Sequence, residues 1–270
     1  MKKKHVAIKS NPSLKTFFLY AFVVFSVIFV SLSVKAFYVI NQSKFDGKNI
    51  TISVSKNNTV VAILGFDVDN KAISVLSLDK SNISHDLTGE KLGVIADAKI
   101  SSSINLPLEN IDSLLTKSLF KTDGVKTDLT YYDSLRLLLF VKSISENSVK
   151  AQQIVLPSNE GKIDEIITNN FSDKLISDES LNVQIVNSTT ISGLGKRLER
   201  IILNKGGNVV AITSARKPEH ESKIYYYGNK SYTAIKIGKL LEFPVEESTE
   251  RSVGDVVVVI GGDYGNSPAF

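Results

Sequence analysis

Few side chains in this sequence could act as catalytic bases or metal ligands. Its 270 residues include three histidines, His5, His85 and His220, and no cysteine. A hydrolytic triad needs a nucleophile, a base and an orienting acid, and none of the histidines adjoins a nucleophile-elbow pattern. His85 lies in a polar loop rich in Ser and Asp, and His220 lies in the charged segment KPEHESK. We therefore expect solvated surface histidines, no metal site and no cofactor.

A second candidate is an anion site at a glycine-rich helix start. Gly193, Gly195, Lys196 and Arg197 follow an expected strand and open an expected helix, with Arg200 one turn further along. The N–H groups at a helix start attract anions, so an acidic ligand or polymer could bind there. The segment lacks the full phosphate-loop pattern and the third glycine of a dinucleotide fingerprint. Close packing of the helix on a strand at Gly195 is the competing interpretation.

The elements that would position this loop follow residue 182. β-Branched enrichment predicts strands over 182–186, 208–214, 223–227 and 255–260. Helices are expected over 192–204, ended by Gly206-Gly207, and over 232–241, capped by Ser231. The order βαββαβ favours two helices on one face of a small sheet.

The region before it, residues 41–181, predicts a mixed α/β domain. Strands are expected over 49–54, 59–65 and 72–78, the last two joined at Asp69-Asn70, and helices over 108–119, 132–144 and 161–171. The short polar segment 177–182 is typical of a domain junction. The predicted fold class is therefore α/β (α+β), with a basic tail (1–15), a transmembrane helix (16–40), a mixed α/β domain (41–181) and a βαββαβ domain (182–270).

The charge distribution indicates a membrane. The net charge is +4, but residues 1–15 hold five lysines and no acid, which leaves the rest of the chain at −1. The nineteen residues 16–34 are uncharged and apolar, long enough to cross a bilayer. A cleavable signal peptide is the alternative, although this run exceeds a usual signal core and Lys35 precedes the candidate cleavage site. Basic flanks stay in the cytoplasm, so we expect a cytoplasmic N-terminus, extracytoplasmic domains and no nucleic-acid partner.

Residues 183–263 resemble the LytR C-terminal domain. The similarity consists of VQIVNSTTISGLGKRLERIILNKGGNVV, then IYYYGNKSYTAIKIGKLL, then DVVVVIGGD, in the family's order and spacing. In that family this domain commonly follows a LytR-CpsA-Psr catalytic domain, whose enzymes transfer lipid-pyrophosphate-linked glycopolymers onto peptidoglycan. Residues 59–180 resemble a shortened form of that domain, in the segments VVAILGFD, AISVLSLDKSN and IDSLLTKSLFKTDGVKTDLTYYDSLRLLL.

The departures from the family pattern bear on activity. The resemblance implies a site of arginines and aspartates, but residues 41–181 contain one arginine, Arg136, inside an apolar helix. The strand that ends in Pro-Arg-Asp in the family ends here in Leu78-Asp79-Lys80, and a lysine does not form the bidentate fork of an arginine. Asp67 and Asp79 are then the possible remnants of the acidic site. We expect that catalysis has been lost.

The leading hypothesis is a single-pass, membrane-anchored bacterial cell-envelope protein related to cell-wall assembly. Its non-catalytic extracytoplasmic domains would bind a cell-wall polymer or an envelope protein. The alternative is an active glycopolymer phosphotransferase with a rearranged site, which would need a deep apolar cavity with cations at its mouth. A third possibility is transcriptional attenuation, as the family name suggests, but we find no DNA-reading element in the sequence.

Overall fold

The computed structural model describes residues 12–79, 82–104, 108, 110–155, 159–215, 217–266 and 270. The chain forms two compact units, one up to Ser43 and one from Lys44 to Phe270. We describe each unit by itself.

The described residues of the first unit form one helix, α1 (Pro12–Asn41), followed by Gln42 and Ser43. At 1.5 Å per residue its 30 residues span about 45 Å, and Leu14–Asn41 is long and apolar enough to cross a membrane. The helix begins four residues before the predicted span, because Pro12 suits the first helical position and Lys15 is a good helix former. The predicted long apolar helix is confirmed, while residues 1–11 of the predicted basic tail, including His5, lie outside the described residues.

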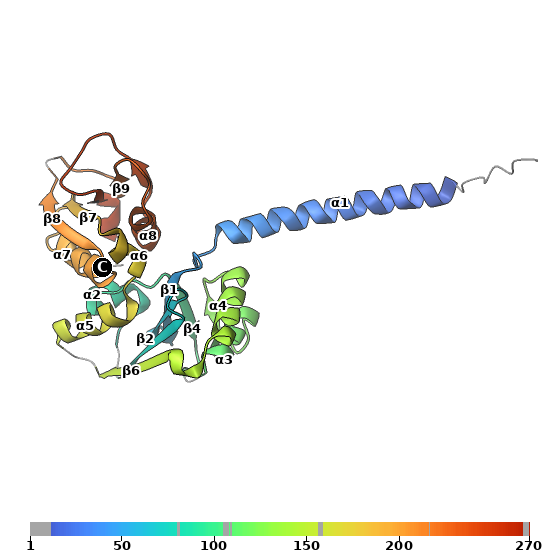
Figure 1. Cartoon of the computed structure of the whole chain (residues 1–270), viewed down its shortest axis with the longest axis horizontal. Helices are drawn as coiled ribbons and strands as arrows, with labels where there is room; N and C mark the ends of the chain where they lie inside the picture. Colours follow the sequence, from blue (N-terminus) through green and yellow to red (C-terminus); the bar gives the residue numbers. More distant parts are fainter. Residues whose placement is uncertain are drawn as a thin grey trace, which may run out of the picture. The chain divides into compact units, whose positions relative to one another are not determined.

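The second unit contains two sheets, of which the first has six strands in the order β5-β4-β1-β2-β3-β6 (Figure 1). These strands are β1 (Asn49–Lys56), β2 (Thr59–Asp67), β3 (Ala72–Asp79), β4 (Ala98–Ser102), β5 (Lys126–Thr127) and β6 (Val149–Val155). Strands β1, β2 and β3 form an antiparallel meander, with β4 parallel to β1 and β6 parallel to β3. The β1–β2 turn is tight because Asn57 and Asn58 both adopt positive φ, as primed hairpin turns require.

Helices cover both faces of this six-stranded sheet, as Figure 1 shows. On one face α3 (Ile111–Phe120) and α4 (Tyr131–Ser143) pack on side chains such as Ile52, Leu64 and Ile100. On the other face α2 (Thr88–Leu92) and α5 (Glu160–Phe171) pack on Ile63 and Leu76. Alternate strand residues point to opposite faces, so each strand contributes to both cores. A 3₁₀ turn (His85–Leu87) precedes α2 and another (Glu146–Ser148) precedes β6.

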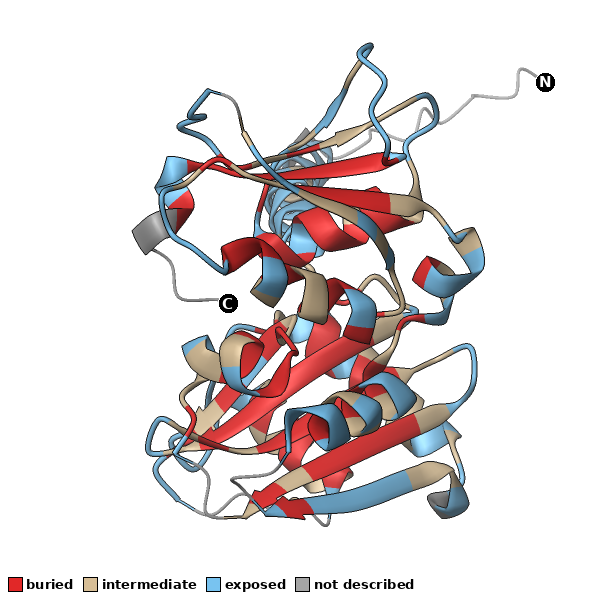
Figure 2. Cartoon of the chain, turned by 90° about the vertical axis from the view of Figure 1, so that its left-hand side faces the viewer, coloured by how far each residue is buried: buried red, intermediate tan, exposed pale blue. Residues whose placement is uncertain are grey.

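The second sheet follows the short helix α6 (Lys174–Glu179) and has five strands in the order β10-β9-β11-β7-β8. Its elements are β7 (Asn182–Asn187), α7 (Leu194–Asn204), β8 (Asn208–Ser214), β9 (Lys223–Tyr226), α8 (Tyr232–Leu241), β10 (Val245–Glu247), β11 (Val256–Ile260) and a 3₁₀ turn (Gly262–Asn266). Both helices pack on one face, where Leu198, Ile201 and Ile237 meet Ile185 and Val258. In Figure 2 the buried residues of this layer are red on both the strands and the helices.

The predicted fold class is confirmed, with additions. The second sheet contains an extra short strand, β10, which lies parallel to β9, so its order is βαββαββ. In the first sheet β4, β5 and β6 were not predicted. Five of the seven residues of β6 are exposed, so this edge strand lacks the apolar alternation that indicates strands in sequence.

Candidate functional site

Charged side chains gather in the protein interior where the two sheets of the second unit meet. We call this group the junction cluster: Asp46, Asp97, Asp173, Lys205, Tyr232 and Lys236. Asp46 and Asp97 precede strands β1 and β4, Asp173 caps α6, Lys205 ends α7, and the last two side chains lie on α8. Charged groups are almost never fully buried unless they are paired, so the pairing in this cluster decides what it can do.

Lys236 is the best-compensated cation of the junction cluster. Its side chain is 4% exposed, and its Nζ lies 3.3 Å from Asp46 Oδ2 and 3.6 Å from Asp97 Oδ1. It also donates to the carbonyl oxygen of Asn49 at 2.9 Å. Burial by itself lowers the pKa of Lys236, but Asp97, Asp46 and Asp173 more than offset this and raise the pKa above its ordinary value. The ammonium group is therefore charged and bound to carboxylates on the first sheet.

Lys205 is less well compensated. Its Nζ donates to Thr51 Oγ1 at 2.7 Å, and burial lowers the pKa of Lys205, with Asp97 opposing that effect and Lys236 adding to it. The ammonium form is thus disfavoured compared with a lysine in water. A buried lysine of this kind could serve as a proton carrier only if a ligand reached it.

Tyr232 completes the junction cluster as a neutral donor. Its hydroxyl lies 2.8 Å from Asp173 Oδ2 and 3.1 Å from Asp46 Oδ2. Burial and these carboxylates raise the pKa of Tyr232, so the phenol keeps its proton. At the same helix start, Glu179 accepts hydrogen bonds from the N–H groups of Tyr232 and Thr233. Burial raises the pKa of Glu179, yet the hydrogen bond from the Thr233 hydroxyl and these two N–H bonds bring the pKa below its ordinary value, as expected for a carboxylate at a helix N-terminus.

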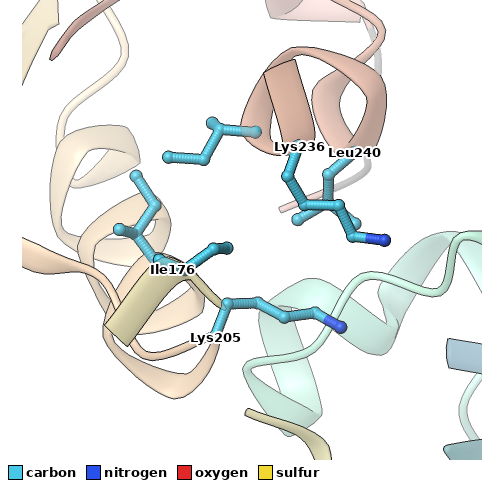
Figure 3. Close-up of a pocket in the computed structure, with 6 residues that line it drawn as sticks. Ile176, Lys205, Lys236 and Leu240 are labelled. Carbon is cyan, nitrogen blue, oxygen red and sulfur yellow. The ribbon is translucent and has the colours of Figure 1, made fainter. Parts of the chain in front are cut away.

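Two small hollows adjoin the junction cluster. One is apolar, about 10 Å³, and lies between the stems of Lys205 and Lys236 (Figure 3), whose amino groups end on the same side of it. The other is polar and about 30 Å³, with Asn49, Thr51 and Asp173 in its wall. A cavity must offer roughly 10–15 Å³ to hold one water molecule. These two hollows hold water molecules at most, and neither admits a pyrophosphate group.

The glycine-rich start of α7 is built for packing. A Cβ on Gly195 would lie 2.6 Å from Ile212 Cγ2 on β8, so only glycine permits the observed approach of helix to strand. Gly193 occupies the N-cap with φ +85°, a conformation that favours glycine. Lys196 is exposed and pairs with Glu199 at 2.7 Å. The packing interpretation of Gly195 agrees with this geometry.

Comparison with known families identifies this second sheet with its helices. Residues 180–264 match the family described as LytR cell envelope-related transcriptional attenuator. We call these residues, which match the family, the LytR C-terminal domain. The match includes all five strands β7–β11 and both helices, which confirms the predicted resemblance. No curated protein and no solved structure matches the chain.

Two cations of the predicted anion site in the LytR C-terminal domain, Arg197 and Arg200, contact the helices of the first sheet. Arg200 donates through Nε to Asp164 on α5 at 2.7 Å and through Nη1 to the Glu90 carbonyl at 3.0 Å. Arg197 lies 3.9 Å from the Glu90 carboxylate. Asn204 adds a hydrogen bond to the Gly93 carbonyl at 3.0 Å. This face of α7 is thus a second polar contact between the LytR C-terminal domain and the preceding sheet.

The two possible remnant carboxylates, Asp67 and Asp79, are far apart. Asp67 ends β2 and accepts from the N–H and side-chain amide of Asn70, which stabilises the β2–β3 turn. In the antiparallel pair Asp67 lies opposite Ala72, and Asp79 lies at the other end of β3. Seven residues of strand separate the ends by about 23 Å, so the fold does not bring the two carboxylates together. Lys80 lies outside the described residues.

The one arginine of residues 41–181 binds groups of the chain itself. Arg136 Nη1 donates to the Phe45 carbonyl at 3.1 Å. Its guanidinium lies over the rings of Phe45 and Tyr132, at 4.7 Å and 5.1 Å from their centroids. Such cation–π contacts stabilise a side chain in place. Arg136 therefore fastens the segment before β1 onto α4.

His85 is not the solvated surface residue that its sequence context predicts. Its Nδ1 and Nε2 lie 2.7 Å from the Ser53 and Ser55 hydroxyls of β1. Both serines are buried, and burial, helped by Lys99, lowers the pKa of His85. The polar sequence around His85 gave no sign that the fold lays this loop over β1. Because neither hydroxyl is accessible, the arrangement is structural, while His220 is exposed as predicted.

The junction cluster itself was not predicted. Its members come from five separate segments, and most have no local pattern. One signal was present: Lys236 lies on the buried face of α8, between Thr233 and Leu240 at helical spacing. A lysine on an apolar helix face indicates a buried partner. Within the described part of the chain, no three His, Asp or Glu side chains gather in a way that could hold a metal ion.

Proposed function

We propose that this chain is a single-pass, membrane-anchored protein of the bacterial cell envelope, and that residues 44–270 bind a cell-wall polymer or an envelope protein without catalysing a transfer. The apolar helix α1 and the LytR C-terminal domain fit a membrane-anchored envelope protein. In the proposed topology the lysine-rich N-terminus is cytoplasmic and the second unit lies outside. The relation of residues 41–181 to a LytR-CpsA-Psr catalytic domain is part of this proposal.

One observation supports the non-catalytic role most strongly: three of the fixed cations are already engaged. Among the described residues, Arg136, Arg200 and Lys236 are held by the chain's own groups. Arg136 is stacked on aromatic rings, Lys236 is bound to carboxylates, and Arg200 is bound to Asp164. Transfer of a pyrophosphate-linked group needs fixed cations aimed at the developing charge, and releasing Lys236 would take the cation away from the carboxylates of Asp46 and Asp97.

The junction cluster supports a scaffold role directly. Lys236 and Lys205, both in the LytR C-terminal domain, reach Asp46, Asn49 and Thr51 of the first sheet. Buried polar groups at a contact are paired in one arrangement of the two sheets, and any other arrangement would leave their charges unpaired. We therefore regard residues 44–270 as one rigid body whose outer surface is presented to a ligand in a fixed arrangement.

Co-sedimentation tests this proposal. The full chain, purified in detergent micelles, is mixed with isolated cell-wall material, with and without its attached glycopolymers, and with a membrane extract treated with a cross-linker. We expect retention on one of the cell-wall samples or a specific cross-linked envelope protein. The absence of both would overturn the binding role, and loss of retention on stripped walls would identify the polymer as the ligand.

The control variant for this assay is Lys236→Met, which weakens the junction cluster without altering the outer surface. A ligand that spans both sheets should bind this variant more weakly, whereas a ligand confined to one sheet should bind it normally. The anchor is tested separately, by alkaline washing of membranes. A chain held by α1 stays with the membrane, and a chain released by the wash contradicts the anchor.

A further inference from the structure

The outer side of α4 is an apolar stripe. Tyr131, Leu135 and Leu139 recur every fourth residue, are 60%, 46% and 59% exposed, and so line one side of the helix. Phe120, at the end of α3, is 69% exposed. The next residue is Lys121, and its Nζ lies 5.4 Å from the centroid of the Tyr131 ring. The end of α3 therefore lies beside the start of α4. We call these four apolar residues, Phe120, Tyr131, Leu135 and Leu139, the α4 face.

The start of α4 is fastened to the first residues of the second unit. Asp133 accepts from the N–H groups of Lys44 and Phe45, both at 3.2 Å. The Phe45 ring is buried in the core between α4 and the sheet. Arg136 holds the Phe45 carbonyl from the next turn of the helix. The chain therefore enters the second unit directly at the N-terminal end of the α4 face.

The covalent connection to α1 is short. Only Gln42 and Ser43 separate Asn41, the last residue of α1, from Lys44. Three peptide steps span at most about 11 Å, only a few ångströms more than the headgroup layer of about 5–8 Å on one side of a bilayer. If α1 spans the membrane, Lys44 and the start of α4 are confined near the membrane surface.

We infer that the α4 face docks on the lipid bilayer, at the leaflet where α1 ends. The chemistry fits this occupant. Phe and Leu suit the upper acyl region, Tyr suits the headgroup level, and the exposed Lys121 and Lys142 at the two ends of the stripe suit anionic headgroups. α4 has 13 residues and so extends about 20 Å, enough to hold the second unit in one orientation on the membrane.

This inference rests on the membrane anchor of the proposed function, and the chain offers a clean probe for it. The sequence contains no tryptophan, so a single introduced tryptophan reports one position. The full-length variants Leu135→Trp and Leu139→Trp are reconstituted in vesicles of phosphatidylcholine and phosphatidylglycerol. The matched control is Leu203→Trp, because Leu203 is also an exposed helical leucine, 45% exposed, on α7. α7 contacts α2 and α5, on the sheet face opposite α4.

We expect blue-shifted emission from both α4 variants, with loss of most emission when the lipids carry bromine. The Leu203→Trp variant should emit as a water-exposed tryptophan and keep its intensity. Vesicle flotation reports anchoring independently. A chain that floats while its α4 variants behave like the control overturns docking alone. A chain that does not float overturns the anchor and the docking with it.

Discussion

Replacing Lys236 should destabilise the second unit far more than replacing an exposed lysine of the same helix. The Lys236 side chain is 4% exposed and faces Asp97, whose side chain is 7% exposed, and Asp46, at 18%. Lys236→Met keeps most of the side-chain volume but leaves two carboxylates and the Asn49 carbonyl without their cation. Removing one partner of a buried ion pair costs about 3–5 kcal/mol. We expect about 3 kcal/mol, the lower end, because water can reach Asp46.

The assay is urea unfolding of the full chain in detergent micelles, followed by circular dichroism. Lys239 provides the control, since it is exposed on α8 one turn after Lys236, and Lys239→Met should change stability by about 0.5 kcal/mol or less. The midpoint should fall for Lys236→Met while the slope with urea stays constant. Equal midpoints for the two variants would refute the buried, charge-paired arrangement of the junction cluster.

Three further predictions concern other contacts. The pKa of His85 lies below its ordinary 6.5, so the stabilisation from neutral His85 is fully present above pH 6.5 and falls as the pH drops toward the folded-state pKa. Between about pH 7.5 and 5 the urea midpoint should therefore fall less in His85→Gln than in the unmodified chain. An equal fall of the midpoint in both proteins would contradict this. Gly195→Ala should destabilise by about 1–3 kcal/mol through overpacking against Ile212, and a stabilised variant would contradict the close packing. Asn204→Ala should cost about 1–3 kcal/mol by leaving the Gly93 carbonyl unpaired, and an unchanged midpoint would show that water replaces it.

Local sequence patterns predicted most of the elements. The strand at Asn208–Ser214 and the helix at Tyr232–Leu241 have the predicted bounds, because β-branched runs and a Ser cap mark them locally. The exposed edge strand β6 and the two-residue β5 were missed. Their pairing depends on neighbours far along the chain, which no local periodicity records.

The candidate site was harder to predict than the fold. The short-range pattern at the start of α7 drew attention to an anion site, which stays a prediction. In the structure Gly195 packs closely on β8, Arg197 contacts α2 and Arg200 contacts α5. The junction cluster joins residues as distant as Asp46 and Lys236, and only the complete fold brings them together. The single arginine of residues 41–181, Arg136, lies over an aromatic ring, and the loss of catalysis inferred from the scarcity of arginine stays a prediction.

Transfer activity is the most direct test of the central claim, which is binding without catalysis. The full chain in vesicles is incubated with a lipid-pyrophosphate-linked glycopolymer, isolated peptidoglycan and Mg²⁺, and the insoluble fraction is analysed for polymer attached covalently to peptidoglycan. The account predicts polymer retention at most, with no covalent product above a sample that lacks the protein. Covalent attachment that depends on the protein would contradict it and favour the phosphotransferase alternative.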